Sequence, residues 1–70
     1  MASILAQIAG TVSKIETKVG AQISIGDVVM FLESMKMVVP VEAESAGRVA
    51  EIPCAEGQTV EEGTVLVVLE

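Results

Sequence analysis

The sequence predicts an all-β domain, a flattened β-barrel or sandwich of two quasi-twofold-related halves with four strands each. Val, Ile and Thr cluster in short runs separated by Gly, and no stretch carries the apolar period of a helix. Residues 6–33 also align without a gap on residues 43–70, so that matched residues lie 37 positions apart. Two copies of such a unit can close into a barrel, which removes exposed sheet edges.

The repeat rests on identities spread along the whole alignment. The identical pairs are Ala6/Ala43, Ala9/Ala46, Gly10/Gly47, Val12/Val49, Ile15/Ile52, Gly20/Gly57, Gly26/Gly63, Val28/Val65, Leu32/Leu69 and Glu33/Glu70. Lys36 lies between the copies, and its symmetry mate falls just beyond the last residue. We therefore expect Lys36 on a hairpin turn, with the two chain ends together at the opposite pole.

Eight strands are expected from the apolar runs and the residues that separate them. Their ranges are Ile4–Ile8, Thr11–Thr17, Gln22–Ile23, Val28–Glu33, Met37–Ala43, Arg48–Ile52, Thr59–Val60 and Val65–Glu70. The matched glycines beside the two shortest strands indicate tight turns, because glycine accepts positive φ.

Gly10, Gly47 and Pro40 require a separate explanation. Gly10 and Gly47 follow matched alanines. They indicate a bend or a close backbone approach within a strand, or they are ordinary loop glycines. Pro40 falls inside an expected strand, and because proline donates no ladder hydrogen bond it predicts an edge strand or a local break.

The composition indicates a single small domain over residues 1–70. Of these residues 51% are hydrophobic, with Phe31 the one aromatic, so a deep aromatic-walled pocket is not expected. The apolar runs are much shorter than the roughly 18 residues of a membrane span, and the N-terminus lacks the features of a secretory signal. A single cysteine, Cys54, agrees with a reducing compartment. These features predict a cytoplasmic protein without a membrane partner.

Charge and residue types argue against several kinds of function. Ten acidic residues against four basic ones give a net charge of −6, which disfavours nucleic acid as a partner. The chain has no histidine, so Cys54 lacks the base that a nucleophile needs, and zinc lacks its usual ligands. We expect no catalytic residue and no metal site, and Cys54 is interpreted as a small, partly buried residue at a strand end. The acidic charge serves solubility or complements a basic surface on a partner enzyme.

The segment Glu33-Ser34-Met35-Lys36-Met37 resembles the attachment motif of the biotinyl/lipoyl attachment domain family. In the biotin branch a methionine lies on each side of the modified lysine, whereas the lipoyl branch usually has an acidic residue before it and a small one after. The resemblance covers the whole chain, and small free-standing carriers are the most similar. Its other parts are Ala6–Val12, Gly20–Asp27, Ala43–Val49 and Gly57–Thr64.

Two features depart from the family pattern. Ala21 stands in a turn where the family often has an acidic residue, which leaves the lysine motif unaffected. The "thumb" loop of some bacterial acetyl-CoA carboxylase carriers is absent, so close kinship with those carriers is in doubt.

The resemblance implies a non-catalytic biotin carboxyl carrier. A biotin protein ligase would attach biotin to Lys36. A biotin carboxylase would then load the carboxyl group, and a carboxyltransferase would move it to an acyl-CoA or a keto acid. Two alternatives are a lipoyl carrier of a 2-oxo-acid dehydrogenase-type complex, with lipoate on Lys36, and an unmodified assembly domain.

The residues around Lys36 are expected to be read by the ligase or the carboxylase. They are Glu33, Ser34, Met35 and Met37. Methionine side chains adapt to irregular partner surfaces, but Met35 and Met37 share one face of an alternating strand, so both could instead pack on the end of the barrel. Glu33 recurs as Glu70 in the copy without a lysine, which indicates a partly structural role.

Overall fold

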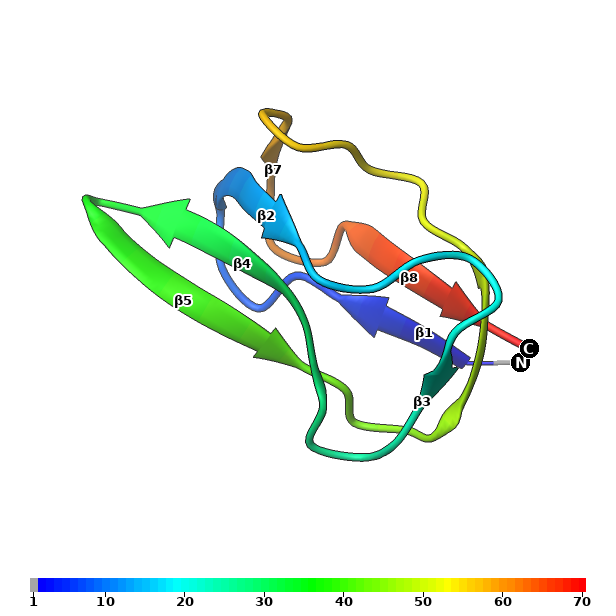
Figure 1. Ribbon diagram of the computed structural model, residues 1–70. Helices are drawn as coiled ribbons and strands as arrows, with labels where there is room; N and C mark the ends of the chain where they lie inside the picture. The colour runs from blue at the N-terminus through cyan, green and yellow to red at the C-terminus, as the bar shows by residue number, and fades with distance from the viewer. Residues whose placement is uncertain (1) are drawn as a thin grey trace.

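The computed structural model describes residues 2–70, and these form an all-β domain (Figure 1). The strands are β1 (Ala2–Leu5), β2 (Gly10–Ile15), β3 (Gln22–Ile23), β4 (Val28–Ser34), β5 (Met37–Glu42), β6 (Gly47–Glu51), β7 (Thr59–Val60) and β8 (Val65–Leu69). The β4–β5 hairpin projects from one end of the molecule, and the start of β1 and the end of β8 lie side by side at the other end (Figure 1). The expected placement of the termini opposite Lys36 is confirmed.

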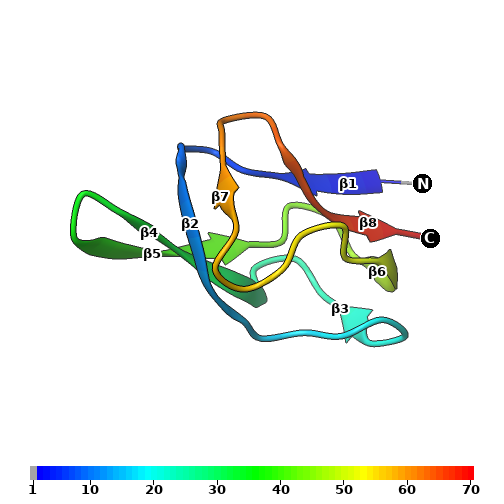
Figure 2. The ribbon, with the colours of Figure 1, turned by 90° about the horizontal axis from the view of Figure 1, so that it is seen from above.

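The strands form two antiparallel sheets of four, in the orders β1-β8-β6-β3 and β5-β4-β2-β7 (Figure 2). Moving each strand 37 positions along the chain converts one sheet into the other, which confirms the predicted twofold relation of the halves. The two sheets are not the two sequence copies, however. Each sheet takes two strands from each copy, so the copies are interleaved and neither can form a sheet alone.

Irregularities in strand pairing are duplicated together with the strands. The register of β2 on β4 shifts between Val12 and Lys14, and that of β6 on β8 shifts between Val49 and Glu51, at the matched positions. The β4–β5 and β1–β8 pairs share a second matched shift. Bulges of this kind bend a strand and increase its twist, which lets two short sheets curve around one core.

Two of the crossings between the sheets occur at small buried residues, Ala6 and Ala43. The Ala43 N–H donates to Asp27 O at 2.8 Å, and Ala43 O accepts from Gly26 N–H at 2.9 Å. Ala6 makes the equivalent pair of hydrogen bonds with Thr64 O and Gly63 N–H, at the same two distances. The tight turns with positive-φ glycines, Gly26 (φ 93°) and Gly63 (φ 90°), therefore hold the crossovers of the opposite copy.

The first expected strand is displaced toward the N-terminus. Residues 2–5 pair with β8, whereas residues 6–9 form the connection to β2, although residues 6–8 were expected to be strand. Ala6 leaves the ladder because its backbone groups bond to the turn at residues 63–64. The other expected strands agree with the structure to within two residues at each end. Pro40 lies on the edge strand β5, opposite Phe31, as one of its two interpretations required.

The core between the sheets is apolar throughout. Its buried residues are Ile4, Ala6, Val12, Ile23, Val29, Met30, Leu32, Val41, Ala43, Val49, Cys54, Val60, Leu66, Val67 and Leu69. No polar or charged residue among residues 2–70 is buried. Aliphatic side chains of this size suit the narrow space between two closely packed sheets.

Alanine substitution at the matched glycines Gly10 and Gly47 separates the two interpretations of these residues. A Cβ on Gly10 would lie 2.6 Å from Glu33 O, whereas a Cβ on Gly47 would lie 3.3 Å from Glu70 O. We expect Gly10→Ala to lower the free energy of unfolding by about 2 kcal/mol through overpacking. For Gly47→Ala the milder contact is offset by the reduced entropy of the unfolded chain, so the change should stay within about 0.5 kcal/mol. Urea denaturation of both variants measures the difference, and equal losses would contradict the close-approach explanation.

Candidate functional site: the lysine turn

Lys36 lies on the connection between β4 and β5, which differs from every other connection in the described chain. The other connections cross from one sheet to the other, whereas β4 and β5 are neighbours in one sheet. Ser34 pairs with Met37 at the end of the ladder, so Met35 and Lys36 alone form the loop. The hairpin carries these two residues beyond the body of the domain (Figure 1). The expected hairpin turn at Lys36 is confirmed.

The turn forces both of its central residues into a left-handed backbone conformation. Met35 has φ 51° and Lys36 has φ 68°, and they are the only non-glycine residues with positive φ in residues 2–70. Positive φ at both central positions of a two-residue hairpin defines a type I′ turn, which favours Asn-Gly. A side chain with a Cβ costs roughly 1–2 kcal/mol in this region. The sequence therefore places strained residues at its most exposed turn.

The two methionines face solvent instead of packing on the barrel. Met35 is 93% exposed and Met37 is 66% exposed. The packing alternative for these side chains is therefore wrong, while their recognition by a partner stays a prediction. Exposed methionine is costly in water, since it leaves a large apolar side chain unburied. A pair of them beside one lysine indicates a surface that another molecule covers.

Glu33 and Ser34 differ from each other in their surroundings. Glu33 is exposed, and its backbone oxygen lies at the close approach to Gly10, as that of Glu70 does at Gly47. The feature that Glu33 shares with Glu70 is thus the contact of its backbone oxygen with the matched glycine. This contact accounts for the predicted structural role of Glu33. Ser34 is half-buried at the base of the turn. All four predicted recognition residues lie beside Lys36, either in the turn or at the adjoining ends of β4 and β5.

The site offers an exposed primary amine on a short, rigid support. Lys36 is exposed, and its backbone is fixed by the ladder between β4 and β5. A lysine amine does not form an amide with a free acid unaided, so it reacts only when an enzyme supplies a base and an activated acid. Within residues 2–70 no group of His, Cys, Asp or Glu side chains is placed to hold a metal ion. The arrangement suits acylation by another protein.

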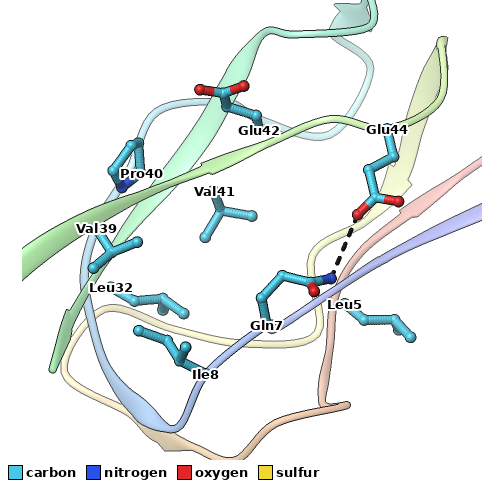
Figure 3. A pocket seen from close by; sticks show the side chains of 9 residues that line it. All are labelled: Leu5, Gln7, Ile8, Leu32, Val39, Pro40, Val41, Glu42 and Glu44. Atoms are coloured by element: carbon cyan, nitrogen blue, oxygen red, sulfur yellow. Dashed lines mark hydrogen bonds between the residues drawn. The ribbon is translucent and has the colours of Figure 1, made fainter.

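Sequence reasoning missed a groove that lies beside the hairpin. A cavity of about 70 Å³ opens between β5 and the β1–β2 connection (Figure 3). Its wall residues are Leu5, Gln7, Ile8, Leu32, Val39, Pro40, Val41, Glu42 and Glu44. A signal was present in the sequence, because the counterparts of Ile8 and Val39 in the other copy are Ser45 and Ala2. At these two positions the larger apolar side chain therefore lies on the lysine side of the domain.

Cys54 is more deeply buried than expected and lies in the β6–β7 connection instead of at a strand end. Its Sγ lies 3.6 Å from Leu66 O and 3.9 Å from the Met30 sulfur. Burial raises the pKa of the Cys54 thiol, and a backbone hydrogen bond offsets part of this. A protonated, enclosed thiol is a poor nucleophile, so Cys54 has a packing role.

Substitution of Met35 tests the strain in the turn. Met35→Asn should raise the free energy of unfolding by about 0.5–1 kcal/mol, because asparagine tolerates positive φ better than methionine. Met35→Val should lower it by about 1 kcal/mol, since a β-branched residue is disfavoured there. Urea unfolding midpoints at constant m value measure both changes. The strain argument fails if Met35→Asn and Met35→Val shift the midpoint in the same direction.

The burial of Cys54 makes it a probe of opening of the barrel. Iodoacetamide at pH 8 should modify the native thiol at least about tenfold more slowly than the urea-unfolded thiol, because only an opened molecule exposes it. The native rate should rise together with the unfolded fraction. Mass spectrometry follows the reaction, and equal native and unfolded rates would contradict the buried position.

Comparison with known proteins places this geometry in a family. The family model described as "Biotin-requiring enzyme" matches residues 1–69. The chain is 46% identical over 63 residues to the Biotin/lipoyl attachment protein of Bacillus subtilis, covering 90% of this chain and 86% of the relative. It is 36% identical over 66 residues to the Biotinylated protein TB7.3 homolog of Mycobacterium leprae, covering 94% and 93% respectively.

Two solved structures with the same fold are much longer chains. A single-chain, multi-domain long-chain acyl-CoA carboxylase matches with a TM-score of 0.86 and 33% identity, over 94% of this chain and 7% of its own. The urea carboxylase of Kluyveromyces lactis matches with a TM-score of 0.91 and 29% identity, over 99% of this chain and 6% of its own. The match over nearly all of the sequence, together with the interleaved fold and the lysine hairpin, shows that the chain belongs to the biotinyl/lipoyl attachment family.

Proposed function

We propose that Lys36 is the attachment point for biotin and that the domain, covering residues 1–70, is the non-catalytic carrier of a biotin-dependent carboxylase. The observation that carries this is the position of Lys36 at the tip of the one connection in residues 2–70 that stays within a sheet, flanked by two exposed methionines. The similarity to a biotinylated protein and to acyl-CoA carboxylase chains supports it. The exposed methionines favour the biotin branch over the lipoyl branch.

Attachment forms an amide bond at the Lys36 side chain. After losing one proton to the ligase, Nζ attacks the acyl carbon of biotinyl-adenylate, AMP leaves with the electrons of the broken bond, and the new amide nitrogen releases a second proton. The reaction removes the positive charge of Lys36. The ligase therefore has to reach the amine from outside the domain, which the projecting turn allows.

The domain contributes position and reach instead of chemistry. Bound biotin supplies the carboxyl-carrying group, and the fold keeps the other end of its arm on a rigid hairpin. A tethered group is present at a high effective concentration at any active site that the arm can enter. We propose a biotin carboxylase and an acyl-CoA carboxyltransferase as the partners, and the cytoplasm as the location. No helix in residues 2–70 is long and apolar enough to cross a membrane.

Intact mass after co-expression tests the attachment site. With a biotin protein ligase, the chain should gain the mass of one biotinyl group, and Lys36→Arg should gain none. Lys14→Arg and Lys18→Arg are matched controls, because both remove another exposed lysine of the same domain. A gain only with a lipoate ligase would replace biotin by lipoate, and a gain with neither would leave an assembly role.

The predicted role of the methionines has its own test. The double substitution Met35→Asp and Met37→Ala should lower kcat/KM for biotinylation at least about tenfold, because a partner loses two apolar contacts and gains a charge to desolvate. Stability should change little, since both side chains are exposed. Val38→Ala removes another exposed apolar side chain of the same hairpin and serves as the control. Unchanged ligation kinetics would exclude recognition through Met35 and Met37.

A further inference from the structure

We propose that the groove between β5 and the β1–β2 connection is a resting site for the ring system of the biotinyl group on Lys36 of the same chain. This inference rests on the proposed function, since it requires the modified lysine. The groove lies between the β4–β5 hairpin and the body of the domain, with Val39 on one wall and Ile8 across from it (Figure 3). Five features carry the proposal, namely reach, lining, polar groups, volume and asymmetry.

The groove is within reach of the modified side chain. Val39 lies three residues beyond Lys36 on β5, which corresponds to about 10 Å along an extended strand. About eleven bonds join the Cα of a biotinyl-lysine to the ring system. At about 1.2 Å per bond, the extended side chain reaches roughly 13 Å from its Cα. The arm therefore covers the distance without any movement of the hairpin.

An apolar face leads from the turn into the groove. Met37, Val39 and Val41 occupy alternate positions of β5 and so share one face of the strand. Their exposure falls along this face, since Met37 is exposed, Val39 is half-buried and Val41 is buried. Ile8 is half-buried on the opposite wall. The aliphatic part of the arm would lie on this face and be removed from water.

The cavity also contains a hydrogen-bonding pair suited to a ureido ring. Gln7 Nε2 donates to Glu44 Oε1 at 3.4 Å, and both side chains are exposed (Figure 3). A ureido group has N–H donors and a carbonyl acceptor, which complement a carboxylate and an amide N–H respectively. The bond is long and solvated, so it can open at little cost. The carboxylates of Glu42 and Glu44 favour an uncharged ring over a carboxylated, anionic one.

The volume fits one ring of the bicycle. About 70 Å³ holds roughly five water-sized groups, close to the size of a five-membered ureido ring. The second ring would stay at the open side, near Val39. A shallow site of this kind gives weak, reversible contact, which leaves the arm available to partner enzymes.

The asymmetry between the copies is the strongest support. Gln7 and Glu44 are themselves symmetry mates, so the hydrogen bond between them marks the pseudo-twofold axis. On the lysine side of this axis the groove has Ile8 and Val39, whereas the equivalent positions on the other side are Ser45 and Ala2. Packing of the fold alone would serve both sides equally well. At these two positions the larger apolar residue occurs on the side where an arm from Lys36 would lie.

Nuclear magnetic resonance of the biotinylated domain tests the proposal, after intact mass has established the modification. In ¹³C,¹⁵N-labelled protein carrying unlabelled biotin, we expect nuclear Overhauser effects from the biotin ring protons to the methyl groups of Ile8 and Val39. Amide shifts of Gln7, Ile8 and Val39 should differ between the modified and unmodified forms. The amide shift of Ala2, the counterpart of Val39 outside the groove, provides an internal reference and should not change.

Two neighbouring substitutions provide the matched comparison. Val39→Ala should remove the ring contacts and the shift change at Ile8, and the fold accepts alanine there because its counterpart is Ala2. Val38→Ala, on the outward face of β5, should leave both intact. Shift changes confined to residues 34–37, without ring contacts, would overturn the resting site while leaving the carrier function in place. Absence of any mass gain would overturn the proposed function and the resting site together.

Discussion

The fold depends on two reciprocal crossovers at Ala6 and Ala43. At each one the chain passes from one sheet to the other, held by two backbone hydrogen bonds to a turn in the opposite copy. These bonds satisfy backbone groups that would otherwise be buried without partners. They also make the copies interdependent, because each copy closes the crossover of the other. The small side chain of alanine lets the turn backbone approach closely at both places.

This interdependence explains why so small a domain can support a projecting hairpin. A chain of this size buries a limited fraction of its surface. Its buried residues form one apolar core between the sheets. The β4–β5 turn lies outside that core and has two residues with unfavourable backbone angles. The ladder between β4 and β5 holds them in place, since Ser34 pairs with Met37 directly beneath the turn. The hydrogen-bonded pairing of β4 and β5 thus keeps Met35 and Lys36 in their strained conformation.

Much of the fold could be predicted from the sequence because the duplication is recorded in matched residues. The eight strands, the pseudo-twofold relation, the turn glycines and the position of Lys36 all follow from the 37-residue offset and the apolar pattern. The expected end of the first strand was wrong, because apolar character continues through Ala6 and Ile8 while the backbone groups of Ala6 bond to residues 63 and 64. The interleaving of the copies was not foreseen, since a repeat alone does not say which strands share a sheet. The groove escaped notice because its walls come from both copies.

The pseudo-symmetry also defines the gap between the chain ends. The ends of β8 and β1 lie side by side, as the ends of β4 and β5 do at the lysine turn (Figure 1). Joining the two ends through a segment equivalent to residues 34–37 would close the chain into a ring with a second hairpin at the other pole. Such a circular protein would have two identical tips pointing in opposite directions, each able to present a lysine. The described chain, by contrast, presents its lysine hairpin at one pole only.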